Sequence, residues 1–241
     1  LNKGAIAIRN GDYETGLREL EPLAEQGNFT AQRIVGLMYH DGLGVPRNIE
    51  TAVKLYTLAA EQGNAASQYT LGVMYNTGEG VLQDERTAAK WFKRAAQQGH
   101  VDAQNNLGVA YSIGKGVQQD DRIAVKWLRL AADTGDPRAQ SNLGVMYYEG
   151  KGVQQDDGVA LRWTTLAAEQ GYVDAQGNLG RRYYNGNGVP QDYEVAVKWL
   201  TLAAEQGETN AQNLLGWMHF DGEGTRQDNV YAYMWGSITA S

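Results

Sequence analysis

The sequence contains no cysteine, only four prolines and only three histidines. The lack of cysteine excludes disulfides, thiolate metal sites and a cysteine nucleophile. No apolar run approaches the roughly 18 residues that a membrane-spanning helix needs, so we expect no membrane span. Basic residues are also scarce, with 21 Lys and Arg against 28 Asp and Glu and a net charge of -7. Because proteins bind phosphate backbones through positive charge, we expect no nucleic-acid partner.

The remaining composition is that of a folded protein, with 42% hydrophobic and 20% charged residues. This is enough apolar material to bury a core, and the chain lacks the proline-rich composition of disordered segments. The first ten residues, LNKGAIAIRN, do not resemble the apolar region of a signal peptide. Since the chain starts at Leu1 and not at Met, we expect a trimmed terminus from which an upstream targeting segment has been removed.

The dominant feature of the sequence is an internal repeat of fixed length. Glycine recurs every 36 residues, each time preceded by Leu or Val, at Gly36, Gly72, Gly108, Gly144, Gly180 and Gly216. The same spacing separates a series of glutamines from Gln32 to Gln212 and a series of tryptophans from Trp91 to Trp235. A fixed period of this length is typical of repeat architectures, in which one small unit is stacked many times.

Each unit has the pattern of two helices joined by a glycine-rich turn. In residues 65–78 the apolar and small residues recur at helical spacing, and Gly78 suits a left-handed helix cap. Asp84 then precedes a second periodic stretch, where its carboxylate can accept amide hydrogens of the first helical turn. Gly99 ends that stretch. The pattern therefore predicts a helix–turn–helix unit.

Two helices this short cannot bury both of their apolar faces alone, so neighbouring units must stack. We therefore predict an all-α fold, a right-handed α/α superhelix of 36-residue helix–turn–helix repeats that forms one repeat domain over residues 1–241. Gly36 and its equivalents let helices approach closely, while Leu71, Tyr75 and Trp91 fill the space between them. The predicted units are a partial N-terminal repeat at 1–27, full repeats at 28–63, 64–99, 100–135, 136–171 and 172–207, and an incomplete last repeat at 208–241.

These units resemble the Sel1-like repeat family, which is related to the tetratricopeptide repeats. The motif reads AASQYTLGVMYNTGEGVLQDERTAAKWFKRAAQQG and returns as VDAQNNLGVAYSIGKGVQQDDRIAVKWLRLAADTG, and the resemblance covers almost the whole chain. It implies a bacterial interaction protein that is periplasmic or secreted and takes part in host contact, envelope assembly or signalling complexes. In the related tetratricopeptide family, a stripe of the first helix lines a concave groove.

Candidate binding residues are those that vary from unit to unit on the first helix, because residues that repeat in every unit are explained by packing. Towards the C-terminus this stripe becomes rich in aromatic residues and arginine, which dominate interface hot spots. Arg182 stands where other units have methionine and follows Arg181, which favours an acidic or carboxylate-bearing ligand. An alternative for the last two candidates is that they seal the end of the superhelix. The candidates are Tyr148, Arg181, Arg182, Tyr184, Trp217 and Phe220.

A series of asparagines, Asn106, Asn142 and Asn178, stands one residue before the invariant leucine of its unit. Their carboxamides can hold the backbone of an extended peptide in the groove. They can equally bond to neighbouring helices and fix the spacing of the units. We include all three among the candidate binding residues.

Catalytic, metal and cofactor sites are not expected. Residues Ser112 to Lys115 form an S-x-x-K string, the acylation motif of penicillin-recognising hydrolases, but its lysine falls in the turn between helices and no K-T-G string accompanies it. The histidines lie in different units without the spacing of metal ligands. We expect no catalytic residue, no metal ligand and no cofactor.

The sequence thus predicts a non-catalytic scaffold, expected to be a monomer, that binds a protein or peptide in the concave groove of its first helices. One alternative is a cell-wall or β-lactam hydrolase with Ser112 as its nucleophile. A second alternative is a structural spacer in an envelope complex, whose ends dock while its groove stays empty.

Overall fold

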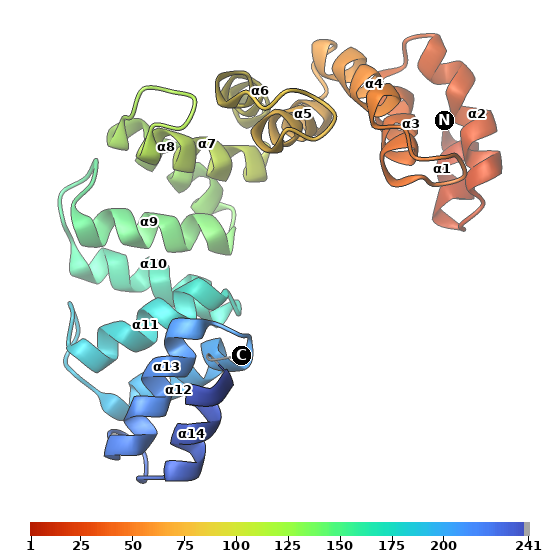
Figure 1. The fold of residues 1–241 in the computed structure, drawn as a ribbon. Helices are drawn as coiled ribbons and strands as arrows, with labels where there is room; N and C mark the ends of the chain where they lie inside the picture. The colour runs from red at the N-terminus through yellow and green to blue at the C-terminus, as the bar shows by residue number, and fades with distance from the viewer. Residues whose placement is uncertain (239–241) are drawn as a thin grey trace. The chain divides into compact units, whose positions relative to one another are not determined.

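The computed structural model describes residues 1–238, and fourteen α-helices account for the regular structure of that range (Figure 1). They alternate between the first and second helices of the repeats, which we call A and B helices. The A helices are α1 (Asn2–Arg9), α3 (Phe29–Asp41), α5 (Ala65–Thr77), α7 (Val101–Ile113), α9 (Pro137–Glu149), α11 (Val173–Asn185) and α13 (Thr209–Asp221). The B helices are α2 (Tyr13–Glu25), α4 (Ile49–Glu61), α6 (Glu85–Gln97), α8 (Asp121–Asp133), α10 (Asp157–Glu169), α12 (Tyr193–Glu205) and α14 (Asn229–Ile238).

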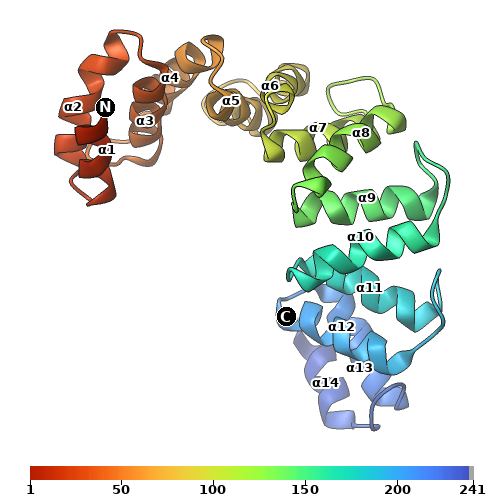
Figure 2. The same cartoon turned by 180° about the vertical axis from the view of Figure 1, so that it is seen from behind.

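The chain divides into two compact units, Leu1–Asp120 and Asp121–Ser241. The first unit holds α1 to α7 and the second holds α8 to α14, so the division falls inside the predicted repeat 100–135. Within the second unit α9 packs against α10, α10 against α11, and α11 against α12 (Figure 2). The first unit follows the same order from α1 to α7, except that the short α1 replaces a full A helix. Each helix thus packs mainly on its neighbours in the chain, as the predicted stacking requires.

The helix ends lie where the sequence predicts them. Gly78 follows α5 with φ of 82°, a left-handed conformation that favours glycine. Asp84 then caps α6, where its Oδ1 accepts hydrogen bonds from the backbone nitrogens of Arg86 and Thr87 at 2.9 and 3.2 Å. Asp156 and Asp192 likewise cap α10 and α12, where each side chain accepts a hydrogen bond from the backbone nitrogen three residues further on. These caps hold the turn between A and B helices in one geometry.

The core of each repeat forms where an A helix and a B helix approach at a glycine. A Cβ atom added to Gly72 would lie 2.5 Å from Cδ1 of Phe92, so only glycine admits the ring at this distance. Leu71 is fully buried beside it. Trp91 is only half-buried, because α6 turns Phe92 and not Trp91 towards Gly72. The indole packs against a cluster that contains residues of its own repeat and of the preceding one. Trp91 therefore packs where two repeats meet.

The repeated glutamines connect one helix pair to the next. Gln68 donates a hydrogen bond from Nε2 to the backbone oxygen of Ala60 at 2.9 Å, and its Oε1 accepts one from Nε2 of Gln98 at 2.8 Å. The same arrangement occurs at Gln32, Gln140 and Gln176. Since a buried carboxamide is costly without partners, this pairing explains why the repeat keeps glutamine here. Among the described residues, no helix has the length and apolar character needed to cross a bilayer.

Candidate functional site

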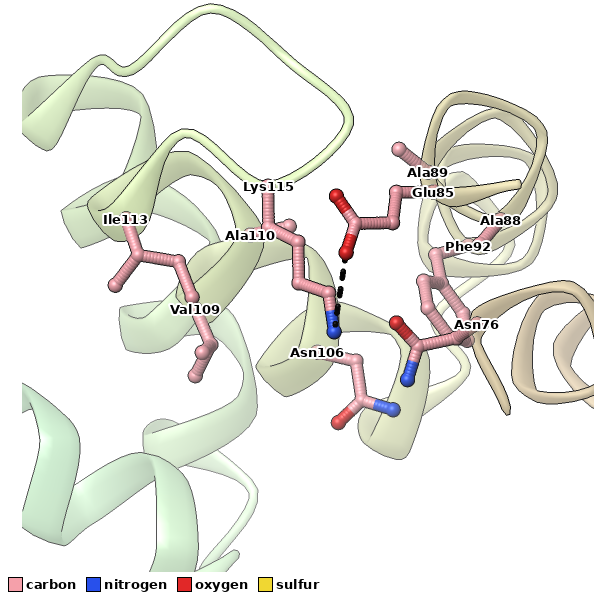
Figure 3. Close-up of a pocket in the computed structure, with 10 residues that line it drawn as sticks. All are labelled: Asn76, Glu85, Ala88, Ala89, Phe92, Asn106, Val109, Ala110, Ile113 and Lys115. Atoms are coloured by element: carbon pink, nitrogen blue, oxygen red, sulfur yellow. Dashed lines mark ion pairs between the residues drawn. The ribbon is translucent and has the colours of Figure 1, made fainter. Parts of the chain in front are cut away.

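Two hollows occur where neighbouring A helices and the B helix between them meet, one in each unit. The first hollow, between α5, α6 and α7, has a volume of about 220 Å³. The second hollow, between α9, α10 and α11, has a volume of about 390 Å³. The first is lined by Asn76, Glu85, Ala88, Ala89, Phe92, Asn106, Val109, Ala110, Ile113 and Lys115 (Figure 3). The second is lined by Gly144, Val145, Tyr148, Glu149, Thr164, Asn178, Arg181, Arg182, Asn185 and Asn187.

The two hollows occupy equivalent positions of the repeat. Most of the lining residues of one correspond to those of the other after a shift of two repeats. The pairs are Asn76 and Tyr148, Phe92 and Thr164, Asn106 and Asn178, Val109 and Arg181, Ala110 and Arg182, Ile113 and Asn185, and Lys115 and Asn187. The fold therefore builds the same hollow twice, and only the side chains that line it differ.

The first hollow is mainly apolar and electrically balanced. Phe92 and Ala110 are buried in its wall, while Ile113 is exposed at the end of α7. Lys115 and Glu85 point towards one another, with Nζ 3.6 Å from Oε1 (Figure 3). Because this ion pair neutralises both charges, the hollow is suited to an uncharged, apolar side chain.

The second hollow is wider and positively charged. Thr164 stands where the first hollow has Phe92, and its hydroxyl donates to the backbone oxygen of Ala160 at 2.9 Å. Arg181 and Arg182 replace Val109 and Ala110, and so bring two guanidinium groups to this place.

Arg182 is only 8% exposed, and its side chain turns back over the preceding A helix. Its Cζ lies 4.9 Å from the ring centroid of Tyr148, a cation–π contact. Its Nε donates to the backbone oxygen of Asn187 at 3.1 Å, and Nη2 donates to that of Asp157 at 3.4 Å. Burial lowers the pKa of Arg182, against the opposing effect of the Asp157 charge, but a guanidinium stays protonated in proteins.

Arg181 and Asn178 also line the second hollow. Arg181 donates from Nη2 to Oδ1 of Asn178 at 2.5 Å, and its Nη1 lies 3.7 Å from Oε2 of Glu208. That carboxylate also caps α13, accepting from the backbone nitrogen of Ala211. Four of the nine predicted residues, Tyr148, Asn178, Arg181 and Arg182, therefore line one hollow.

The structure places the other predicted residues elsewhere. Tyr184 packs on Tyr193 with ring centroids 5.4 Å apart, and burial together with a hydrogen bond to Glu223 raises the pKa of its hydroxyl. Trp217 and Phe220 are 63% and 49% exposed on α13 and contact each other edge to face, with centroids 6.1 Å apart. Neither of these two groups lines a hollow described above. Asn106 lines the first hollow, and Asn142 lies half-buried on α9.

Ser112 and Lys115, the residues of the hydrolase alternative, each have another partner in the structure. The Ser112 hydroxyl donates to the backbone oxygen of Val109 at 2.8 Å, within its own helix. Lys115 is engaged with Glu85. A general base must lie within hydrogen-bond reach of the proton it removes, and this arrangement directs the lysine to a carboxylate instead.

Sequence reasoning missed the walls that come from the B helices and the turns. Phe92 and Thr164 lie on B helices, and Lys115 and Asn187 lie in the turns after A helices. The signal was present in the sequence, since each pair stands 72 residues apart and differs in size or charge. A comparison limited to the A helices did not reveal these differences.

Comparison with known proteins agrees with the repeat assignment. The Sel1 repeat model matches residues 30–64, 65–100, 101–136, 137–172, 173–208 and 209–240. A search of curated proteins gave no match. Among solved structures, the chain is similar to a Sel1 repeat protein from Oxalobacter formigenes, with 32% identity, a TM-score of 0.90 and coverage of 98% of this chain and 94% of the other.

A second similar structure is a protective antigen of uropathogenic Escherichia coli strains with an SLR fold, at 38% identity and a TM-score of 0.87. The match covers 93% of this chain but 48% of the antigen, so the chain spans about half of that relative's length. An immunity protein from Pseudomonas aeruginosa shares the fold at 22% identity and a TM-score of 0.56, covering 87% of this chain and 80% of the other. With six matched repeats along an all-helical repeat fold, the chain belongs to the Sel1 repeat family.

Proposed function

We propose that this chain is a non-catalytic scaffold that holds an extended segment of a partner protein along its A helices. Sel1 repeat proteins are generally protein-interaction scaffolds. The observation that carries the proposal is the pair of equivalent hollows, whose lining varies while the packing residues around them repeat. A hollow that keeps its position in the repeat and changes its lining side chains is suited to taking different ligand side chains in different repeats.

In this mechanism, the asparagines meet the backbone of the ligand and the hollows take its side chains. Asn106 and Asn178 each line a hollow, and a carboxamide offers both a donor and an acceptor to a peptide group. The first hollow takes an apolar side chain, and the second takes a polar or charged one. Rigid helix pairs hold both hollows open before binding, which lowers the entropic cost of recognition.

We further propose that the chain works as a monomer outside the cytoplasm, in the periplasm or beyond the cell. The resemblance to exported members of its family supports this location, as does the similarity to a protein described as a protective antigen. Fractionation of the source cells, with a cytoplasmic and a periplasmic marker, tests the location. Recovery with the cytoplasmic marker alone would contradict it.

Affinity capture followed by crosslink mapping tests the proposed function. The variant Tyr148→Asn with Arg181→Val gives the second hollow residues that the first hollow already carries. It should lose a partner that the wild type captures and crosslinks at α9 or α11. Exposed leucines on the B helices supply a matched control, since Leu166→Lys with Leu202→Lys alters the other main surface of the same unit. Loss of the partner in the leucine variant alone would move binding to the B helices and refute the proposal.

A further inference from the structure

We infer that the second hollow binds a carboxylate group of the bound segment, held by Arg181 and Arg182. The inference rests on the proposed function and deepens it, because it assigns the ligand chemistry of one position. A carboxylate reaches this hollow either as an acidic side chain or as the C-terminal end of a chain. Both sources present the same planar pair of oxygens, which matches the fork of a guanidinium.

The state of Arg182 gives the first reason. This residue replaces methionines that are nearly fully buried at Met38, Met74 and Met146, so a cation occupies a position that the fold elsewhere fills with an apolar side chain. Burying a charge is costly unless an opposite charge compensates it. In residues 1–238, the hydrogen-bond acceptors of Arg182 are two backbone oxygens, and no carboxylate forms an ion pair with it. The charge of Asp157 acts on Arg182 without an ion-pair contact, and a ligand carboxylate would supply that direct contact.

The charges around the hollow give the second reason. Glu149 lines it, but its Oε2 lies 2.7 Å from Nζ of Lys151, which neutralises it. Glu208 approaches Arg181 at 3.7 Å while capping a helix, so its charge is shared. Asp157 accepts a hydrogen bond from Arg182 through its backbone oxygen, while its carboxylate acts on the guanidinium through its charge alone. Among the residues that line the hollow, two arginines stand against one glutamate, in a chain whose net charge is -7.

The third reason is that the site is held in place before any ligand arrives. Tyr148 supports the guanidinium of Arg182 from α9, and Asn178 orients that of Arg181 on α11. Thr164 leaves room above them that Phe92 fills in the first hollow. The first hollow, with Val109 and Ala110 at the same positions, has no such cations and serves as an internal comparison.

Four matched peptide libraries test the inference. Each contains random nonapeptides without other acidic residues, with either Glu or Gln at the centre and either a free or an amidated C-terminus. The immobilised whole chain is incubated with each library, and retained peptide is measured by mass spectrometry. Because hydrogen bonds to an ionised group are stronger than those between neutral groups, we expect the carboxylate version to be retained about tenfold or more over its neutral match. Preference for central Glu identifies a side chain, and preference for the free terminus identifies a chain end.

Variants taken from the chain's own repeats make the result specific. Arg182→Met restores the residue of the other repeats, and Arg181→Val restores that of Val109, so both should keep their helicity by circular dichroism. Each should remove the carboxylate preference. Arg162→Met removes an exposed cation of α10 outside the hollow and should leave the preference intact.

The remaining outcomes separate the two proposals. Equal retention of all four libraries by the wild type would overturn the carboxylate inference while leaving peptide binding in place. A preference that survives both Arg182→Met and Arg181→Val would also overturn it, because the carboxylate would then be held elsewhere. Retention of no library would overturn the inference together with the proposal that the A helices hold an extended segment.

Discussion

The guanidinium of Arg182 lies over the ring of Tyr148, with Cζ 4.9 Å from the ring centroid. The two residues belong to successive A helices, α11 and α9, so this contact joins one repeat to the next. Both positions vary from repeat to repeat, and the two side chains depend on each other. The Tyr148 ring covers the buried guanidinium, and the guanidinium holds the ring at the second hollow. This one contact therefore packs two repeats together and also shapes the candidate site.

Replacement of Arg182 should separate the effect of its charge on stability from the effect of its side-chain volume. Arg182→Met should leave the free energy of unfolding unchanged or raise it by about 1 kcal/mol, because a well-packed apolar side chain replaces a desolvated charge. Arg182→Ala should lower it by roughly 2–3 kcal/mol, since it leaves a cavity in the same place. Urea unfolding of both variants checks this. A larger loss for Arg182→Met than for Arg182→Ala would show that the arginine stabilises the repeat through its hydrogen bonds.

Two turn glycines should respond differently to the same substitution. Gly99 and Gly116 both have left-handed backbones, with φ of 84° and 72°. A Cβ atom on Gly99 meets nothing within 4 Å, whereas one on Gly116 would lie 2.0 Å from the backbone oxygen of Glu85. Gly99→Ala should cost about 1 kcal/mol for the backbone conformation alone. Gly116→Ala should cost a further 1–3 kcal/mol from the clash, and equal losses in denaturant unfolding would contradict the close approach.

The hydrogen bond between Gln68 and Gln98 predicts that replacing one residue lowers the free energy of unfolding more than replacing the other. Gln68→Ala removes a buried donor from the Ala60 oxygen and the acceptor of Gln98, so it should lower the free energy of unfolding by roughly 1–3 kcal/mol. Gln98→Ala removes a more exposed partner and should cost about 1 kcal/mol or less. A double variant gives the coupling between them, and additive losses would show that the bond between the two carboxamides contributes nothing.

The pKa values of two histidines in the first unit should be shifted in opposite directions. A hydrogen bond to Asp41, supported by Glu79, raises the pKa of His40 above its usual value of 6.5. Burial lowers the pKa of His100 below the same value. Since the folded pKa of His40 is raised, its stabilisation is complete below pH 6.5 and is lost as pH rises through that raised pKa. NMR titration of both imidazoles checks the directions, with His40→Gln removing the corresponding pH dependence of unfolding.

The hydrolase alternative makes a prediction that is simple to test. Because the Ser112 hydroxyl donates to its own helix and Lys115 is engaged with Glu85, we expect no hydrolysis of nitrocefin above the buffer rate. Ser112→Ala should give the same trace as the wild type in this absorbance assay. Turnover that disappears in Ser112→Ala would establish an enzyme and displace the scaffold proposal.

Much of the candidate site followed from comparing repeats within the sequence. Variation on the A helices led to Tyr148, Arg181 and Arg182, and the asparagine series led to Asn178; all four line the second hollow. The same reasoning grouped Tyr184 with them, although its ring packs on Tyr193 beyond the hollow. Side chains along one helix point in different directions, so two variable residues of the same A helix do not have to line the same hollow.

The sequence by itself determined the repeat, the alternation of A and B helices, and the caps at Gly78 and Asp84, because these depend on local backbone preferences and on periodicity over a few turns. Only the tertiary structure decided that Arg182 reaches back to Tyr148 and that Thr164 opens a hollow which Phe92 narrows in the other unit. Those relationships depend on how three helices pack and on how far each side chain extends between them. A period in sequence fixes which positions are equivalent, whereas packing fixes which of them touch.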